Sequence, residues 1–293
     1  MQPLKFYVSP AIKAPIKRVV WHVQSVLLKD ALSEWKTLET DVAIGQIHRL
    51  SSGVVRVDAD ADMAGLDQSW RMSAHQYPWS LTDEEGLVLY DVITSNGLKS
   101  GFEIATAFGY SSLYVGLALK RNDGTLTSMD CYVEEEKGTY HYEHKDIHAE
   151  AERVRGRIAA GQPPAGLAIA RQNVNRLGLD KTIRFEIGVS PQDVPRFVGS
   201  DPIDFAYIDG GHFGDQPLQD FLAIAPNLAS KCAVCFHDNN SPIIGQAVAE
   251  AERMLQARAI TFRTRYRMTI VGRNLDLGRV QKLADVLRHR HFF

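Results

Sequence analysis

The chain has few cysteines, no long apolar run and almost no net charge, and each shortage excludes a class of protein. Three cysteines among 293 residues cannot build a disulfide framework, which fits a reducing compartment. His22, Gln24 and Ser25 interrupt the most apolar stretch near the start, so no membrane helix is expected. A formal net charge of -2 argues against a nucleic-acid partner held by a broad basic surface. We therefore expect a cytoplasmic protein with no membrane span.

A glycine-rich dinucleotide fingerprint is also absent. The turn that follows the first apolar strand has Ala105 where that fingerprint places its first glycine. A nicotinamide-dependent dehydrogenase is accordingly disfavoured.

What the sequence does contain is an alternation of short apolar runs with helical patterns. The runs expected to form strands are 99–105, 125–130, 182–187, 203–208 and 233–236. Helices are expected over 111–119, 167–177 and 246–256, and two short strands within 259–272 suggest an antiparallel edge hairpin. Strands that alternate with helices indicate βαβ units, and hence an α/β fold with a mostly parallel sheet.

Two segments do not follow this alternation. Residues 1–75 show a helical pattern over 16–40 and no βα rhythm, so we expect a mainly helical extension and a main domain over 76–293. The connection after the second strand is too long for a simple crossover. We therefore expect an insertion at about 132–165, placed over the carboxyl edge of the sheet like a lid. The N-terminal helix is a plausible homodimer contact.

Polar side chains follow two of the expected strands. Asp209 comes directly after the run 203–208, and Asp238 and Asn239 come just after the run 233–236. Ligands of open α/β sheets bind beyond the carboxyl ends of the strands. Two carboxylates and an amide are hard oxygen donors that suit Mg²⁺. This pattern favours a metal-assisted enzyme.

A further acid closes the second strand. Asp130 stands 27 residues after Glu103, which lies near the end of the first strand. An acid at the end of the second strand can accept hydrogen bonds from both hydroxyls of a ribose. The other interpretation is that it caps the following helix. If Asp130 binds a ribose, then this acid and a turn without the glycines of a phosphate-binding loop together favour a cationic nucleoside as cofactor.

The region from about residue 79 to 272 resembles the class I S-adenosylmethionine-dependent methyltransferases, and within them the metal-dependent catechol O-methyltransferase type. The motifs that carry the resemblance are Glu103-Ile-Ala105, Gly109-Tyr110-Ser111, Asp130, Gly188-Val-Ser190 with Gln192, Asp209, and Asp238-Asn239. The resemblance implies a Rossmann-like, doubly wound sheet of seven strands. It also implies that the motifs up to Gln192, together with Asp209, bind S-adenosylmethionine, and that Asp209, Asp238 and Asn239 bind Mg²⁺ or another divalent cation.

The sequence departs from this family in three places. Ala105 replaces a glycine, and Pro191 interrupts the step from Ser190 to Gln192. His212 stands where catechol-type enzymes have a lysine as general base. A histidine titrates near neutral pH, so His212 is the first candidate for the base. His237 is the second candidate, or a residue that orients Asp238.

The function implied by the resemblance is Mg²⁺-dependent transfer of a methyl group to a hydroxyl of a small acceptor with adjacent oxygens, such as a catechol, a phenol or a sugar. One alternative is a metal-dependent hydroxylase or hydrolase of the antibiotic-tailoring type on the same scaffold. Another is a subunit that binds the cofactor without catalysis. Three smaller features favour plain structural roles, namely Cys232 with Cys235 as buried thiols, Asp58, Asp60 and Asp62 as a solvated turn, and His141, His144 and His148 as a polar helix face.

Overall fold

The computed structural model describes residues 81, 83–132, 147–199, 201–264, 266–278, 280–281 and 284. The expected extension over 1–75, the acidic turn at 58–62, and His141 and His144 lie outside this part of the chain. The division into an extension, a main domain and an insertion therefore stays a prediction. Among the described residues, no helix is long and apolar enough to cross a membrane.

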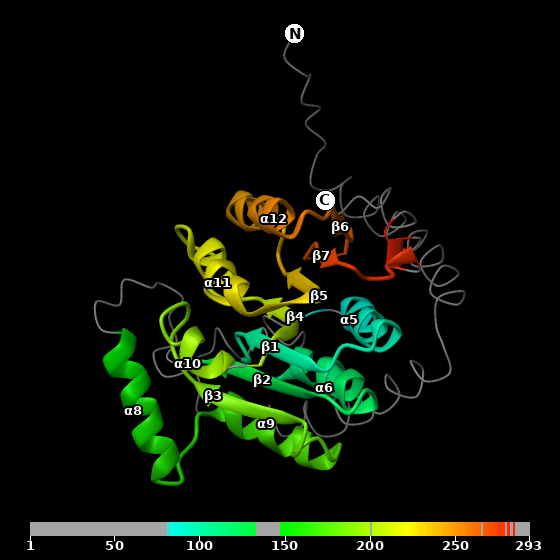
Figure 1. Ribbon diagram of the computed structural model, residues 1–293. Coiled ribbons are helices and arrows are strands. Elements are labelled where there is room, and N and C mark those ends of the chain that lie inside the picture. Colours follow the sequence, from blue (N-terminus) through cyan, green and yellow to red (C-terminus); the bar gives the residue numbers. More distant parts are fainter. Residues whose placement is uncertain are drawn as a thin grey trace, which may run out of the picture.

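The centre of the fold is a seven-stranded sheet in the order β3-β2-β1-β4-β5-β7-β6 (Figure 1). Its strands are β1 (Ser100–Ile104), β2 (Thr125–Asp130), β3 (Ile183–Ile187), β4 (Ile203–Ile208), β5 (Leu228–Phe236), β6 (Ala259–Thr261) and β7 (Thr269–Arg273). The first five are parallel to one another, and β7 pairs antiparallel with both β5 and β6. The α/β fold with an antiparallel edge hairpin is thus confirmed.

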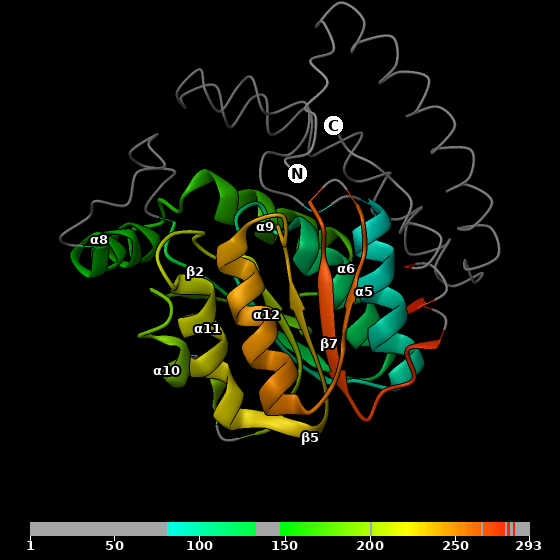
Figure 2. The ribbon, with the colours of Figure 1, turned by 90° about the horizontal axis from the view of Figure 1, so that it is seen from above.

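Helices cover both faces of the sheet. They are α5 (Asp83–Asn96), α6 (Tyr110–Arg121), α8 (Ile147–Ala159), α9 (Ala165–Arg176), α10 (Val194–Val198), α11 (Gln216–Ile224) and α12 (Pro242–Leu255). Figure 2 shows α5 on one side of β7 and α11 and α12 on the other. This is the doubly wound arrangement, in which the central parallel strands β1 and β4 are covered from both sides, whereas the edge strand β3 is only partly buried.

The central strand β4 shows why the apolar runs fold in this way. Phe205 and Tyr207 belong to the core cluster under α5 and α6, whereas Ala206 and Ile208 belong to the cluster under α11 and α12. Successive side chains of a strand point to opposite faces, so a strand covered on both faces needs a continuous apolar run. This requirement is what made the strand visible in the sequence.

Two elements differ from the sequence-based boundaries. Strand β5 begins at Leu228, which pairs with Ile203 of β4, and a register shift separates this pair from the next one, Phe205 with Ala233. Helix α12 begins at Pro242 rather than at residue 246, with Ser241 as its N-cap. Proline suits the first helical turn, where its missing N–H leaves no bond unmade.

Part of the expected insertion is described. Helix α8 packs through Val154 against Tyr132 and Leu167. Arg155 on the same helix donates a hydrogen bond of 2.7 Å to the carbonyl of Ile187, the last residue of β3. The helix therefore lies beside the carboxyl end of β3.

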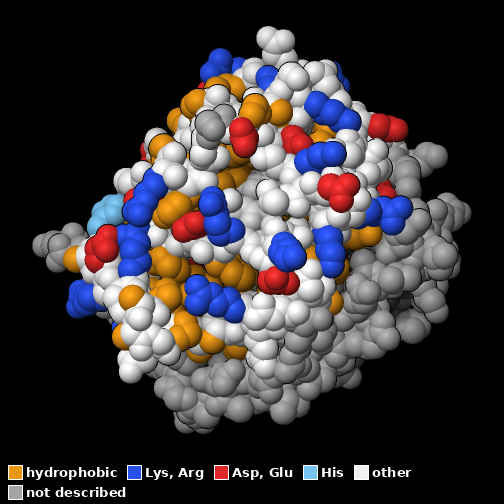
Figure 3. Space-filling view, turned by 60° about the horizontal axis from the view of Figure 1, so that its bottom comes forward, with side chains coloured by type: hydrophobic (Ala, Val, Ile, Leu, Met, Phe, Trp, Pro, Cys, Tyr) orange, Lys and Arg blue, Asp and Glu red, His pale blue; other side chains and the backbone are white. Residues whose placement is uncertain are grey.

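On the face shown in Figure 3, described basic and acidic side chains are interspersed with hydrophobic ones.

Candidate functional site

The turn after β1 is built around a buried carboxylate. Glu103 is fully buried and accepts hydrogen bonds from the hydroxyls of Ser111, Ser112 and Ser128. Burial raises the pKa of Glu103 to about 7, and the three serine hydrogen bonds act against this shift. Glu103 thus joins the start of α6 to β1 and β2 from within the protein. Its carboxylate faces these serines, so it supports the turn that the motif forms.

The backbone of this turn is left-handed at two alanines. Ala105 has a φ of 77° and Ala107 a φ of 44°. An L-residue with a side chain pays about 1–2 kcal/mol for such a conformation, which glycine adopts freely. At Gly109, with a φ of 76°, an added Cβ would lie 2.8 Å from the Cβ of Ala170. The turn therefore holds Ala105 and Ala107 in conformations that favour glycine, and it leaves no room for a side chain at Gly109.

Asp130 holds the neighbouring backbone at the end of β2. Its two carboxylate oxygens accept hydrogen bonds of 2.8 Å from the N–H groups of Ala107 and Tyr132. Burial raises the pKa of Asp130, and these backbone hydrogen bonds oppose the shift. Asp130 is half-buried, so part of the residue is still accessible to a ligand.

The turn after β3 lies next to Asp130. The N–H of Gly188 donates a 3.0 Å hydrogen bond to the carbonyl of Asp130. A Cβ at Gly188 would lie 2.6 Å from the ring of Phe197, so this close approach requires glycine. Ser190 is half-buried two residues further on, whereas Gln192 is exposed. The structure thus brings Gly188 together with Asp130 and leaves the side chain of Gln192 toward solvent.

A buried acid that the sequence analysis did not single out supports the same region. Asp220 on α11 accepts a 2.9 Å hydrogen bond from Gln216, which also donates to the carbonyl of Ser190. Its Oδ2 is buried, has no hydrogen-bond partner among the described residues, and lies 2.8 Å from where a Cβ of Gly210 would stand. Burial raises the pKa of Asp220 to about 7. Because a Cβ at position 210 would lie so close to the Asp220 carboxylate, glycine is the residue that fits directly after Asp209.

The carboxyl ends of β4 and β5 bring three potential metal ligands together. Asp209, His212 and Asp238 each offer one ligand atom, and these atoms lie within 4.8 Å of one another. Nε2 of His212 is 3.8 Å from Oδ1 of Asp209, and its Nδ1 is 3.5 Å from Oδ2 of Asp238. Two carboxylate oxygens and an imidazole nitrogen fit a divalent cation, and the nitrogen suits a transition metal better than it suits Mg²⁺.

His237 lies behind these ligands, between two acids. Its Nδ1 is 3.1 Å from Oδ1 of Asp209 and its Nε2 is 3.4 Å from Oε2 of Glu85 on α5. Burial alone would lower the pKa of His237, but the Asp209 carboxylate and its hydrogen bonds to Asp209, Asp238 and Glu85 raise it well above the usual value. His237 is 2% exposed, so it orients Asp209 from inside the protein.

Burial also governs the charge of Asp209. Desolvation raises its pKa, and the charge of Asp238 adds to the shift, while His237 and His212 lower it. The site thus contains three carboxylates and two imidazoles, which belong to Asp209, Asp238, Glu85, His212 and His237. The partly desolvated negative charge fits a cation, which would stabilise the ionised form of Asp209.

Asn239 is placed differently from the two aspartates. Its side-chain amide donates a 2.7 Å hydrogen bond to the hydroxyl of Thr269 on β7. Its backbone N–H donates a 2.9 Å hydrogen bond to the carbonyl of Arg267. The amide is therefore oriented by the edge hairpin, and only its oxygen is left for a metal.

Glu85 is a second buried acid of this site that the sequence motifs did not indicate. It belongs to α5, and its second oxygen accepts a hydrogen bond from the hydroxyl of Thr264. A signal was present, since Glu85 precedes Val88 and Leu89 at the helical spacing of a buried face. The same glutamate also fits a capping box with Thr82, which hid this signal.

Comparisons with known proteins agree with this fold. Residues 102–239 match the family model described as "Methyltransferase domain". The O-methyltransferase TomG from Streptomyces achromogenes, solved in complex with SAM, is 16% identical, with a TM-score of 0.45, 81% of this chain covered and 90% of that one. An O-methyltransferase from Bacillus cereus, in complex with SAH, is 14% identical, with a TM-score of 0.46 and 77% and 96% covered. A search of curated sequences gave no match.

The family match and the strand order fall on the same part of the chain. The segment 102–239, which matches the methyltransferase-domain model, carries strands β1 to β5 of a Rossmann-like sheet. It contains the turn after β1, Asp130, and the whole Asp209, His212 and Asp238 cluster.

Proposed function

We propose that the protein transfers the methyl group of S-adenosylmethionine to a hydroxyl of a small acceptor, with the help of Mg²⁺ or another divalent cation. The acceptor has two adjacent oxygens, as in a catechol, a phenol with a neighbouring oxygen, or a sugar. The observation that carries the proposal is the cluster of Asp209, His212 and Asp238 within 4.8 Å, where β4 and β5 end.

The cofactor and the metal fit different parts of this edge. Asp130 and the turn over 105–109 form the cofactor side, and Asp209 lies between them and Asp238. When bound, the cofactor supplies an activated methyl group, and the cation lowers the pKa of a coordinated hydroxyl. The residues of the chain hold both reactants in one geometry, which lowers the entropic part of the barrier.

The two histidines have different roles in this proposal. His212 is about one-third exposed and lies between the carboxylates of Asp209 and Asp238. It can take the proton of the acceptor hydroxyl or act as the third ligand. His237 is buried behind them, so it is a positioning residue that fixes the Asp209 carboxylate.

The decisive experiment is the substitution Asp238→Asn. Asp238 has a φ of 53°, a conformation that asparagine tolerates, so the turn should persist while one charge is lost. We expect turnover with a catechol panel to fall by about 100-fold or more and its dependence on Mg²⁺ to disappear, as for the loss of a metal ligand. Calorimetry should show that S-adenosylmethionine still binds.

The matched control is Asp215→Asn, which removes the same charge from an exposed position near the corner. It should leave both turnover and cofactor binding unchanged. Undiminished wild-type turnover in excess chelator would refute the metal role. Cofactor binding with no methylated product across catechols, phenols and sugars would instead favour the non-catalytic subunit.

A further inference from the structure

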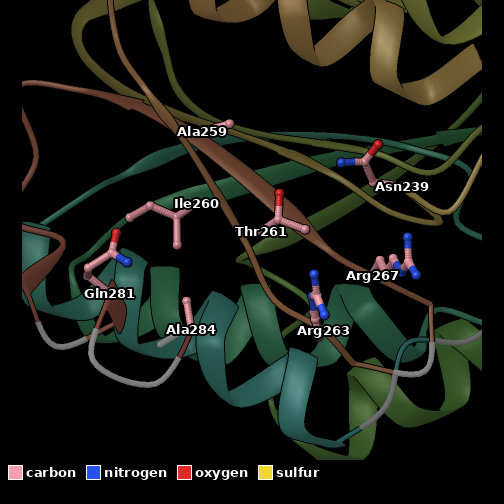
Figure 4. A pocket seen from close by; sticks show the side chains of 8 residues that line it. All are labelled: Asn239, Ala259, Ile260, Thr261, Arg263, Arg267, Gln281 and Ala284. Atoms are coloured by element: carbon pink, nitrogen blue, oxygen red, sulfur yellow. The ribbon is translucent and has the colours of Figure 1, made fainter. Parts of the chain in front are cut away.

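A polar pocket lies beside the edge hairpin, next to the cluster of Asp209, His212 and Asp238, which we call the metal corner. It has a volume of about 400 Å³ and is lined by Asn239, Ala259, Ile260, Thr261, Arg263, Arg267, Gln281 and Ala284. In Figure 4, Arg263 and Arg267 lie toward the end where Asn239 stands, and Gln281 and Ala284 lie at the other end. The pocket therefore runs from the catalytic edge of the sheet along β6.

The two arginines of this pocket are not neutralised by the described part of the chain. No carboxylate, carbonyl or aromatic ring among the described residues binds either guanidinium group, whereas Arg155, Arg184 and Arg253 each pair with an acid. Both arginines are exposed. Two positive side chains that line one pocket favour the binding of an anion there.

The loop that carries these arginines is attached to the metal corner at three points. The carbonyl of Arg267 accepts the hydrogen bond from the N–H of Asn239, and the ring of Tyr266 lies 5.2 Å from that of His237. The hydroxyl of Thr264 donates to Glu85. Arg267 keeps a left-handed backbone, with a φ of 56°, to make its contact. The backbone of the loop is therefore anchored beside Asp238 and Asn239.

We propose that Arg263 and Arg267 bind an oxyanion, a carboxylate or a phosphate, that the acceptor carries in addition to its reacting hydroxyl. The proposal rests on the proposed function and adds the chemical class of the substrate. The planar fork of arginine matches both oxyanions with paired hydrogen bonds. The anionic end in the pocket directs the uncharged hydroxyl toward Asp209 and Asp238. It also keeps the negative group away from these acids.

Direct binding tests the pocket without any methyl transfer. Calorimetry with inorganic phosphate and with benzoate, in chelator, should give binding of at least one of them to the wild-type chain. The double variant Arg263→Gln/Arg267→Gln should lose this binding by roughly tenfold or more, as expected for charge-assisted hydrogen bonds. The control Arg258→Gln removes the same charge from an exposed arginine outside the pocket and should bind as the wild type does. Equal affinity in the wild type and the double variant would overturn the proposal.

Kinetics then test whether the anion belongs to the acceptor. Protocatechuate and its methyl ester share one catechol and differ in charge. The double variant should raise the KM of the acid by about tenfold or more and leave the KM of the ester unchanged, since only the acid uses the arginines. An equal change for acid and ester would overturn the assignment to the acceptor. If neither compound is methylated while phosphate or benzoate still binds through the arginines, the proposed function fails for catechols and the oxyanion site stands.

Discussion

His237 is held between Asp209 and Glu85, with its Nδ1 3.1 Å from the first and its Nε2 3.4 Å from the second. His237 directly follows β5, Asp209 directly follows β4, and Glu85 lies on α5, so this contact joins the helix that precedes the sheet to the cluster of potential metal ligands. A buried imidazole with an acid on each side has a fixed ring orientation, and it transmits this orientation to the carboxylate of Asp209.

Replacing this imidazole should weaken metal binding. We expect His237→Ala to lower the affinity for Mg²⁺ by about 10–100-fold, the usual cost of losing a group that orients a metal ligand. It should also reduce the free energy of unfolding by about 3 kcal/mol, because the buried charges of Asp209 and Glu85 lose their partner. Metal titration by calorimetry and urea unfolding measure the two effects. His148→Ala, an exposed position on α8, is the control and should change neither.

The left-handed backbone at Ala105 predicts a stabilising substitution. Ala105→Gly should raise the free energy of unfolding by roughly 1 kcal/mol, because the strain of a φ of 77° is larger than the chain entropy that glycine loses. Urea unfolding without cofactor measures this difference. Ala118→Gly, in the middle of α6, should destabilise the protein by about 1 kcal/mol. A loss of stability in both variants would contradict the explanation by backbone strain.

The buried carboxyl of Glu103 predicts a pH-dependent stability. Its pKa is raised from 4.5 to about 7 in the fold, so the folded protein holds a proton that the unfolded chain releases between these values. The contribution to stability is therefore complete below pH 4.5 and is lost as the pH rises through 7. Relative to the variant Glu103→Gln, the free energy of unfolding of the wild type should fall by about 3 kcal/mol at most across this range. A difference in free energy of unfolding between the two proteins that stays the same at every pH would disprove the shift.

Much of the fold could be predicted because parallel strands buried on both faces read as continuous apolar runs. The run at β4 and the carboxylate after it, Asp209, were both visible for this reason. Glu85 could not be assigned from the sequence, since its partner His237 lies 152 positions away and nothing local indicates that contact. The role of Arg267 depends in the same way on a backbone hydrogen bond to Asn239 that joins two distant turns.

The boundaries of a functional fragment follow from the position of Glu85. The matched segment 102–239 includes His237 but neither α5 nor the loop that carries Thr264. A protein truncated to these residues would lack Glu85, and the imidazole of His237 would be exposed to water. An autonomous catalytic unit must therefore start no later than α5 and extend through β7, well beyond the stretch that sequence similarity delimits.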